Sequence, residues 1–538
     1  RMLLAESYNA LYYPDLAVGE AYKALLVLDE MLDEPGDDRR AWDCARRSIA
    51  LRSGSAAAVN VEVQDDEVLV WVTEHWLDFV YTHLVEVLID MGCLRSAGEF
   101  LHRWSAAKPD ADLSPFEKRL RDVSQRRCGS ADGPPSLKEL PDRTMVRREL
   151  YPWNNHEPDR FAPKCLDFLN ERMREVAPKL EVRAVELPLL QPDAPAKACK
   201  QLGVFAKQDI QPGETILVEK SLLTASSRMH DSFCDACSTR LPRAPTASST
   251  PEEVTAFEAC VPCDDCDDVV FCSAECRHQA LRTYHDLLCG EDVDTIAKDA
   301  PPAEAADAMY SLLLLRALAM AGQQSEHPLD LPEVKYIWGD YHGVPLAEGP
   351  VYTHTPDEWD ARKPEIDEED ASGGFPRTLP FSFHANVVLP LHMLEKIGFD
   401  PLDPIGEGLS DVWVVNTLYA KFRGTASARQ GPDGRPEVAA VHPLWCLANH
   451  DCDPNVAWDW DGAVRFWARE RRAQWKGRKR RRKPGLRAGD QVLSHYTDVE
   501  LGVKDRREWA AGALGGTCMC ERCVWESGLG SGLGSGLE

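Results

Sequence analysis

Cysteine spacing is the feature that most constrains how this chain can fold. Of its 18 cysteines, 11 contribute to tight spacings, in a middle segment, in the stretch NHDCDPN and in CMCERC near the carboxyl end. No secretory pattern opens the sequence. In a long chain of that kind, Cys-x-x-Cys pairs favour zinc and a reducing compartment over disulfides. We therefore expect the chain to fold partly around metal ions.

Four ligand pairs follow one another in the middle segment. They are Cys234 and Cys237, Cys263 and Cys266, Cys272 and Cys276, and His285 and Cys289. Eight ligands suffice for two closed tetrahedral sites, which are structural because no position stays open for chemistry. A segment this short and polar needs metal to supply its folding energy. Cys260 is an alternative partner for Cys263.

A third group is predicted from residues far apart in the sequence. Within NHDCDPN (residues 449–455), Cys452 stands between two aspartates, where a thiol gains neither apolar burial nor easy ionisation. The CMCERC motif supplies Cys518, Cys520 and Cys523. These three lack a fourth ligand, and joining them to Cys452 completes a zinc site that ties the tail to the loop. Cys446 or a histidine is the alternative fourth ligand.

Length and charge set further bounds. The 538 residues suggest about three or four domains. The net charge of −27 argues against general binding to nucleic acid or anionic membrane and suits a basic partner. The longest apolar run, Met309 to Ala321, contains Arg316 and falls short of the ~18 residues of a membrane span. We expect it to form a buried helix that stops at Gly322.

The pattern of apolar residues changes along the chain. Residues 1–128 show helical spacing, and a helix–turn–helix unit in residues 83–110 resembles a degenerate tetratricopeptide repeat (TPR). An ordinary helical bundle is the alternative. Residues 203–223 predict a strand, a turn at QPG and a second strand. Residues 351–374 predict a solvated acidic loop.

These motifs together resemble a known family. CDDCDDVVFCSAEC followed by YHDLLC is similar to the MYND zinc finger. NHDCDPN resembles the signature of SET-domain lysine methyltransferases, CMCERC resembles their post-SET cysteines, and LGVFAKQDIQPGE resembles their opening glycine strand. A finger between those halves is typical of the SET–MYND subfamily. The resemblance covers about residues 183–526, and a helical region placed before such a domain resembles some fungal relatives.

The resemblance implies an α+β multidomain fold. An N-terminal all-α, helical-repeat-like region would precede a mostly-β SET domain with an inserted MYND zinc finger and a post-SET zinc site. The expected divisions are residues 1–128 (TPR-like helical region), 129–182 (linker with a helix), 183–230 (first part of the SET domain), 231–290 (finger), 291–440 (helical and irregular insert), 441–512 (second part of the SET domain), 513–526 (post-SET segment) and 527–538 (flexible tail).

The resemblance also assigns ligands and a cofactor. One zinc would take Cys234, Cys237, Cys272 and Cys276, a second Cys263, Cys266, His285 and Cys289, and the post-SET site brings the total to three ions. S-adenosylmethionine would be held by the backbone of Lys200, Leu202 and Gly203, by Asn449 and His450, and by Asn416 as a further contact. Tyr496 occupies the place of the catalytic tyrosine.

Three departures from the family pattern stand out. Gln201 replaces the first glycine of the usual Gly-x-Gly, where the backbone must approach the cofactor closely, although an outward side chain would be harmless. Asp451 replaces the family serine. Between Arg469 and Leu486 the chain carries an insertion whose basic run, Lys476–Lys483, predicts a solvated loop, a nuclear-import signal, or a patch for nucleic acid or an acidic partner.

The implied function is methyl transfer from S-adenosylmethionine to a lysine side chain of a basic protein, possibly a histone, in the nucleus and/or cytoplasm. The alternative is a catalytically weak or inactive adaptor, whose finger and N-terminal helices bind peptide partners. Neither hypothesis involves a membrane, and nucleic acid would enter only through the basic run.

Overall fold

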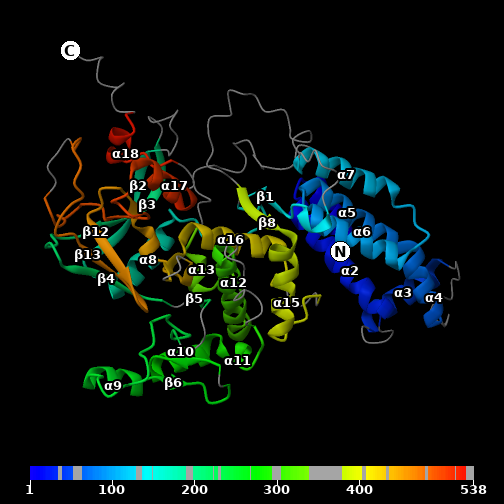
Figure 1. Ribbon diagram of the computed structural model, residues 1–538, viewed down its shortest axis with the longest axis horizontal. Helices are drawn as coiled ribbons and strands as arrows, with labels where there is room; N and C mark the ends of the chain where they lie inside the picture. The colour runs from blue at the N-terminus through cyan, green and yellow to red at the C-terminus, as the bar shows by residue number, and fades with distance from the viewer. Residues whose placement is uncertain are drawn as a thin grey trace, which may run out of the picture.

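The computed structural model describes residues 1–33, 39–52, 63–128, 136–147, 150–188, 198–221, 223–227, 232–266, 268–293, 305–338, 378–402, 408–431, 435–478, 483–514 and 517–528. Figure 1 shows N-terminal helices at one end, a strand-rich part at the other, and a small cysteine-rich segment below. A layer of helices lies between the two ends. The acidic loop at 351–374 falls outside the described residues, as do most of the tail and residues 479–482 of the basic run.

Helices occupy the N-terminal region throughout its described parts. They are α1 (Met2–Ala10), α2 (Pro14–Asp33), α3 (Arg39–Arg52), α4 (Asp65–Val72), the π-helix η2 (Thr73–Leu77), α5 (Asp78–Met91), α6 (Leu94–Ala107) and α7 (Ser114–Cys128). Gly92 ends α5 with a left-handed φ of 84°, which glycine adopts without a Cβ penalty. Within the described part of residues 1–128, all regular elements are helices.

The N-terminal helices share one apolar core with the middle layer, which consists of α12 (Ala305–Gln324), the π-helix η5 (His384–Val388), α15 (Leu389–Lys396) and α16 (Val412–Thr425). Gly19 of α2 approaches α16 so closely that an added Cβ would lie 2.3 Å from Val412 Cγ2. The ring centroids of Tyr22 and Phe383 lie 5.2 Å apart. The helical region is therefore packed onto the rest of the chain rather than joined to it only by a linker.

The segment between the helices and the strand-rich part also takes part in the fold. It contains the 3-10 turn η3 (Leu137–Glu139), β1 (Arg143–Arg147) and α8 (Pro163–Val176). Strand β1 pairs antiparallel with β8 (Thr378–Ser382), which lies within the expected insert. The expected linker with a helix therefore also supplies a strand.

The strand-rich part contains several small sheets. Its elements are β2 (Leu180–Pro188), β3 (Ala198–Ala206), β4 (Thr215–Lys220), β5 (Leu223–Ser226), β9 (Ser427–Gln430), β10 (Pro436–Val441), the 3-10 turn η6 (Trp445–Leu447), β11 (Asn449–His450), β12 (Val456–Trp460), β13 (Ala463–Ala468) and β14 (Leu493–Ser494). The sheet orders are β2-β3, β12-β13-β4, β5-β10-β9 and the parallel pair β11-β14. Strands β3 and β4 flank the predicted turn, where Gly213 has φ 79°, but each pairs with a different partner.

The parallel pair β11-β14 positions the candidate site. Asn449 lies opposite Leu493, and His450 lies opposite Ser494. The side chain of Asn455 reinforces this pairing, because its Nδ2 donates to Gln491 O (2.7 Å) and its Oδ1 accepts from Leu493 N (2.7 Å). The loop NHDCDPN is thereby fixed against the strand that leads to Tyr496.

The finger, residues 232–289, packs beneath the middle layer. It contains α9 (Pro251–Glu258), β6 (Val261–Pro262), β7 (Val270–Phe271), α10 (Ala274–Thr283) and α11 (His285–Leu288). Buried Arg316 of α12 anchors it, since its guanidinium contacts Asp235 Oδ1 at 3.0 Å and lies 3.7 Å from the Tyr284 ring centroid. Arg316, the charged residue within the apolar run Met309 to Ala321, thus binds α12 to the finger.

Helix α12 also corrects one expectation. It is the one described helix long and apolar enough to be tested as a membrane span, but 72% of its apolar window is buried within the protein. It continues past Gly322 to Gln324. An added Cβ at Gly322 would lie 2.6 Å from Phe399 Cε2, so this glycine permits close packing instead of stopping the helix. Helices α13 (Pro332–Lys335), α17 (Val503–Leu514) and α18 (Glu521–Glu526) complete the fold.

Candidate functional site

The structure brings the finger ligands into two groups. One contains Cys234, Cys237, Cys272 and Cys276, and the other contains Cys263, Cys266, His285 and Cys289. Sulfur–sulfur distances include 3.7 Å for Cys237–Cys272, 3.6 Å for Cys272–Cys276 and 3.8 Å for Cys263–Cys289. A tetrahedron with metal–sulfur bonds of about 2.3 Å has edges of about 3.8 Å, so both groups fit one ion each. The ligands interleave as the resemblance implied, and Cys260 lies outside both groups.

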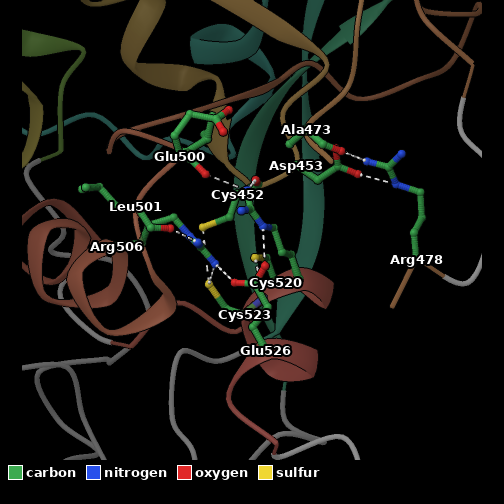
Figure 2. A network of polar contacts seen from close by, with 12 residues as sticks. Cys452, Asp453, Ala473, Arg478, Glu500, Leu501, Arg506, Cys520, Cys523 and Glu526 are labelled. Carbon is green, nitrogen blue, oxygen red and sulfur yellow. Dashed lines mark hydrogen bonds and ion pairs between the residues drawn. The ribbon is translucent and has the colours of Figure 1, made fainter. Parts of the chain in front are cut away.

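The third group joins the tail to NHDCDPN. The Sγ atom of Cys452 lies 3.9 Å from that of Cys518 and 3.4 Å from that of Cys523, and Cys520 completes the group. Cys452 and Cys523 are fully buried. Figure 2 shows Cys452, Cys520 and Cys523 gathered at one place. Cys446, the alternative ligand, points its thiol at Pro443 O instead. The cysteine between two aspartates is thus explained by partners far along the chain.

A fourth compact group, absent from the sequence predictions, combines His156, His327 and Asp330. The two imidazole rings stack with centroids 3.8 Å apart and planes 7° from parallel. His156 Nδ1 lies 2.7 Å from Asp330 Oδ2, and His327 Nδ1 accepts a bond from Leu329 N (3.2 Å). No spacing in the sequence indicated this group, because its first and last members are far apart.

The ring of His450 connects Cys452 to Tyr496. Its Nδ1 accepts a hydrogen bond from the backbone N–H of Tyr496 (3.0 Å), which leaves the proton of the neutral ring on Nε2. That Nε2 lies 3.2 Å from Cys452 Sγ. Burial lowers the pKa of His450 to about 4, so the ring is neutral at pH 7. Both ring nitrogens are engaged, and a cofactor contact from His450 would use its backbone or its ring face.

Gly203 lies at a close approach between three elements. A Cβ there would lie 3.2 Å from Asn449 Nδ2 and 2.9 Å from Gln491 Nε2. The Asn449 amide donates to Leu202 O at 2.9 Å, which holds β3 against β11. Lys200 directs its ammonium over the Phe161 ring, 4.6 Å from the centroid, so only its backbone remains for the expected cofactor contact.

Three buried polar atoms in residues 491–497 have no hydrogen-bond partner within the described structure. They are Gln491 Nε2, Ser494 Oγ and Thr497 Oγ1. Buried polar groups are normally satisfied, and Gln491 Nε2, which lies against Gly203, is placed to bind a polar ligand there. Sequence reasoning missed Gln491, although its place directly after Gly489-Asp490 in the tyrosine strand was an available signal. The residues around Gly203 therefore fit a polar cofactor.

Tyr496 lies beside Gly203, Asn449 and Gln491, which together form what we call the cradle. Its hydroxyl donates to Ala448 O at 3.0 Å, and its ring centroid lies 5.2 Å from that of His450. Because the hydroxyl hydrogen is directed to a carbonyl, the oxygen lone pairs face elsewhere and can accept a further bond. The neighbouring His495 turns away and stacks on Trp458, with centroids 5.7 Å apart.

Two expectations need correction. Asn416 is not brought to this cradle: its buried side chain donates to Asp15 Oδ2 (2.7 Å) and accepts from Asn386 Nδ2 (2.9 Å), so it joins α16 to α2 and η5. Gln201 is only 8% exposed. Because side chains alternate along a strand, Gln201 faces the same side of β3 as Gly203, and its side chain does not point outward.

The start of the basic run also has a structural role. Arg478 pairs with Asp453 Oδ1 at 2.7 Å and donates to Ala473 O at 2.6 Å. Gly477 lies against the Trp525 ring, where an added Cβ would be 2.2 Å from Cγ. Of the three readings of this run, a freely solvated loop therefore does not describe its first residues.

The structure contains two cysteine-rich groups in the finger and a third, the Cys452 group, next to the cradle and Tyr496. This is the arrangement expected of a SET–MYND protein. No family model matches the chain. It is 34% identical over 108 residues to the human protein-lysine N-trimethyltransferase SMYD5, covering 17% of this chain and 26% of that protein. The mouse SMYD5 is 33% identical over 106 residues, covering 17% and 25%. The resemblance to this family is confirmed, and the matched part spans about a quarter of these relatives.

Proposed function

We propose that this chain is an S-adenosylmethionine-dependent protein-lysine methyltransferase. The observation that carries the proposal is the continuous connection from Cys452 through His450 to Tyr496, beside the cradle formed by Gly203 and Asn449. A tyrosine fixed in this way next to orphaned buried polar atoms is arranged to handle a ligand, not only to fill a core. The name of the SMYD5 relatives supports the same reaction class.

Zinc is the proposed ion in all three cysteine groups. Thiolate sets of this composition select zinc over hard cations such as magnesium or calcium. All ligand positions come from the protein, so the ions would stabilise structure and would not act on substrate. Twelve residues would hold three ions, as the resemblance implied.

The cradle residues would hold the cofactor mainly through backbone and amide groups. When bound, S-adenosylmethionine supplies an activated methyl group. The backbone of Lys200, Leu202 and Gly203 would line it, and the amides of Asn449 and Gln491 would bind its polar groups. The absence of a Cβ at Gly203 lets these two amides lie close to β3. The buried setting would keep water away from the reacting atoms.

Tyr496 would orient the lysine amine. A lysine of pKa ~10.4 is neutral in only about one molecule in 2,500 at pH 7, a cost of roughly 4.6 kcal/mol. A buried channel lowers that pKa, because desolvation disfavours the ammonium. With its proton directed to Ala448 O, the Tyr496 oxygen can accept an N–H of the neutral amine and align its lone pair.

The proposed substrate is a lysine in a basic protein, with histones as candidates. The net charge of −27 would attract such a protein. Action in the nucleus and/or cytoplasm is proposed because the Cys-x-x-Cys pairs favour a reducing compartment. Nuclear import through Lys476–Lys483 would have to work with a run whose Arg478 is paired with Asp453.

Calorimetric titration of zinc-loaded protein with S-adenosylmethionine tests the proposal. We expect one site in the micromolar range and at least tenfold weaker binding in Asn449→Ala, which removes the amide beside Gly203. The variant Tyr496→Phe should keep cofactor affinity within about threefold and lower methyl transfer to a basic protein extract at least about 100-fold. No binding by folded wild type would sink the proposal.

One observation favours the alternative adaptor function. The Gln201 side chain is buried on the same face of β3 as Gly203, where it competes for the space that a cofactor needs. An adaptor would use the finger and the N-terminal helices to bind peptides. The variant Gln201→Gly separates the two: as an enzyme, the chain should bind S-adenosylmethionine several-fold more tightly, and as an adaptor it should bind none in either form.

A further inference from the structure

Two buried arginines lie beside the Cys452 group and meet at one carboxylate. Arg506 is 1% exposed and Arg522 is 7% exposed. Arg522 Nε donates to Glu526 Oε1 at 2.8 Å, and Arg506 Nη2 contacts Glu526 Oε2 (Figure 2). All three residues come from the tail helices or their immediate surroundings, so the tail carries a compact charged unit. We call this unit, Arg506, Arg522 and Glu526, the arginine clamp.

The clamp binds backbone on both sides of the site. Arg522 Nη1 donates to Cys452 O at 2.9 Å and to Val499 O at 2.8 Å. Arg506 Nη1 donates to Leu501 O, and its Nη2 lies 3.7 Å from Cys523 Sγ. Arg522 therefore joins the NHDCDPN loop to Val499, three residues after Tyr496. Arg506 holds the same segment at Leu501.

The charges explain why the clamp is stable inside the protein. A buried arginine without partners is costly, whereas these two donate to carbonyls, to a carboxylate and to a thiol. Four thiolates around a divalent ion would carry a net charge of −2 and Glu526 adds −1, so the two guanidinium groups, with +2, offset most of this negative charge. Charge-assisted bonds of this kind fix geometry as well as charge.

We propose that the arginine clamp positions Tyr496: Arg522, set by Glu526 and Arg506, holds residues 499–501 against the Cys452 group and thereby fixes the tyrosine from its carboxyl side. His450 holds the backbone of Tyr496 itself, on the other side. The inference rests on the proposed function, because it gives the tyrosine a catalytic geometry to keep. Glu526 is the residue that prevents both guanidinium groups from turning away.

A third arginine offers a matched control. Arg478 also binds the NHDCDPN loop, but through Asp453, and its other bond goes to Ala473 O (Figure 2). The change Arg478→Ala therefore removes a guanidinium from the same loop without touching a bond to residues 499–501. Arg522→Gln removes the bond to Val499, and Glu526→Gln keeps both clamp arginines while weakening their orientation.

Hydrogen exchange of the zinc-loaded protein, read for the amides of residues 496–502, is the deciding measurement. We expect Arg522→Gln to accelerate exchange there at least about tenfold, Glu526→Gln less, and Arg478→Ala to leave it within about twofold. Zinc content should stay at that of wild type, and cofactor affinity should change less than about threefold. Turnover should fall at least about tenfold in kcat with little change in KM, and Arg522→Lys should restore part of it.

Unchanged exchange at residues 496–502 in Arg522→Gln, with zinc retained, would overturn the inference. Loss of zinc in that variant would also overturn it, because the arginine would then serve the metal group and not the tyrosine. If Arg522→Gln does not fold, Glu526→Gln decides by the same readings. Hydrogen exchange can be measured without cofactor or substrate. If Arg522→Gln exchanges faster but the wild-type protein binds no S-adenosylmethionine, the positioning role of the clamp stands and the proposed methyltransferase function is wrong.

Discussion

Two groups of metal-ligating side chains in this chain are equally compact, yet only one is arranged to bind an ion. In both the Cys452 group and the His156 group the ligand atoms lie within 4.8 Å of one another. The four thiols have lone pairs that can all meet at one central point. The two imidazoles stack nearly in parallel, and a ligating ring holds its metal in its own plane. A shared ion would lie far out of both planes.

The remaining partners widen the difference. His327 Nδ1 already accepts the Leu329 N–H, and Asp330 is held by Lys335 at 2.6 Å. In the Cys452 group the neighbouring donors, His450 and the arginine clamp, stabilise thiolates. The comparison teaches that proximity and residue type do not define a metal site. The direction of lone pairs and the partners already engaged decide it.

The largest expected effect comes from removing one ligand in each group. Cys523→Ser should release one of three zinc ions and cost about 5 kcal/mol or more of stability, because binding energy at a structural zinc is folding energy. His156→Phe should leave zinc content at three. Elemental analysis of folded protein and thermal unfolding measure both. A fourth zinc equivalent in the wild-type protein that is lost in His156→Phe would show that the His156 group also binds an ion and would contradict the comparison.

A smaller effect is expected from adding one methyl group near each group. Gly477→Ala would drive a Cβ into the Trp525 ring, and Gly408→Ala would place one 2.8 Å from His327 Nε2, at a φ of 90°. Each should cost about 1–3 kcal/mol. Only Gly477→Ala should also alter zinc retention during dialysis against a weak chelator. Equal loss of zinc in both variants would contradict the distinction.

The smallest effect concerns acid. Burial lowers the pKa of His327 from 6.5 to about 4, with neighbouring His156 adding to the shift and Asp330 and Asp411 opposing it. Between pH 4 and pH 6.5 the unfolded state therefore binds more protons at this residue than the folded state does. The contribution of His327 to the free energy of unfolding is fully present above about pH 6.5 and is lost as the pH drops toward 4. After allowance for partial exposure the loss is about 1–2 kcal/mol. His327→Phe should flatten thermal midpoints over pH 4–6.5, and an unchanged slope would contradict this.

Much of the site was predictable because its chemistry is written in local spacing. The four finger pairs and the Cys452 group follow from residue type and spacing, whereas the interleaving of the finger ligands was implied by the resemblance to the MYND finger. Apolar periodicity indicated helices in residues 1–128. The errors share one cause, which is tertiary surroundings that no spacing reveals. Asn416 was expected beside the cofactor and instead bonds to Asp15, and Gly322 was expected to end a helix that passes it. The His156 group has no motif, and in the arginine clamp only Arg522 lies within one, CMCERC, whose spacing says nothing about the partners of that arginine.

The order in which the chain is made gives the tail group a further consequence. Gly203 and Asn449 leave the ribosome well before Cys518 and Cys523 do, and at about 5–20 residues per second the cradle must wait for seconds without its brace. A nascent chain, or one truncated before Cys518, would carry every cradle residue and the bonds of Tyr496 to His450 and Ala448, but would lack the bonds from Arg522 to Cys452 O and Val499 O. The Cys452 group would thus be the last of the three cysteine groups to assemble during synthesis.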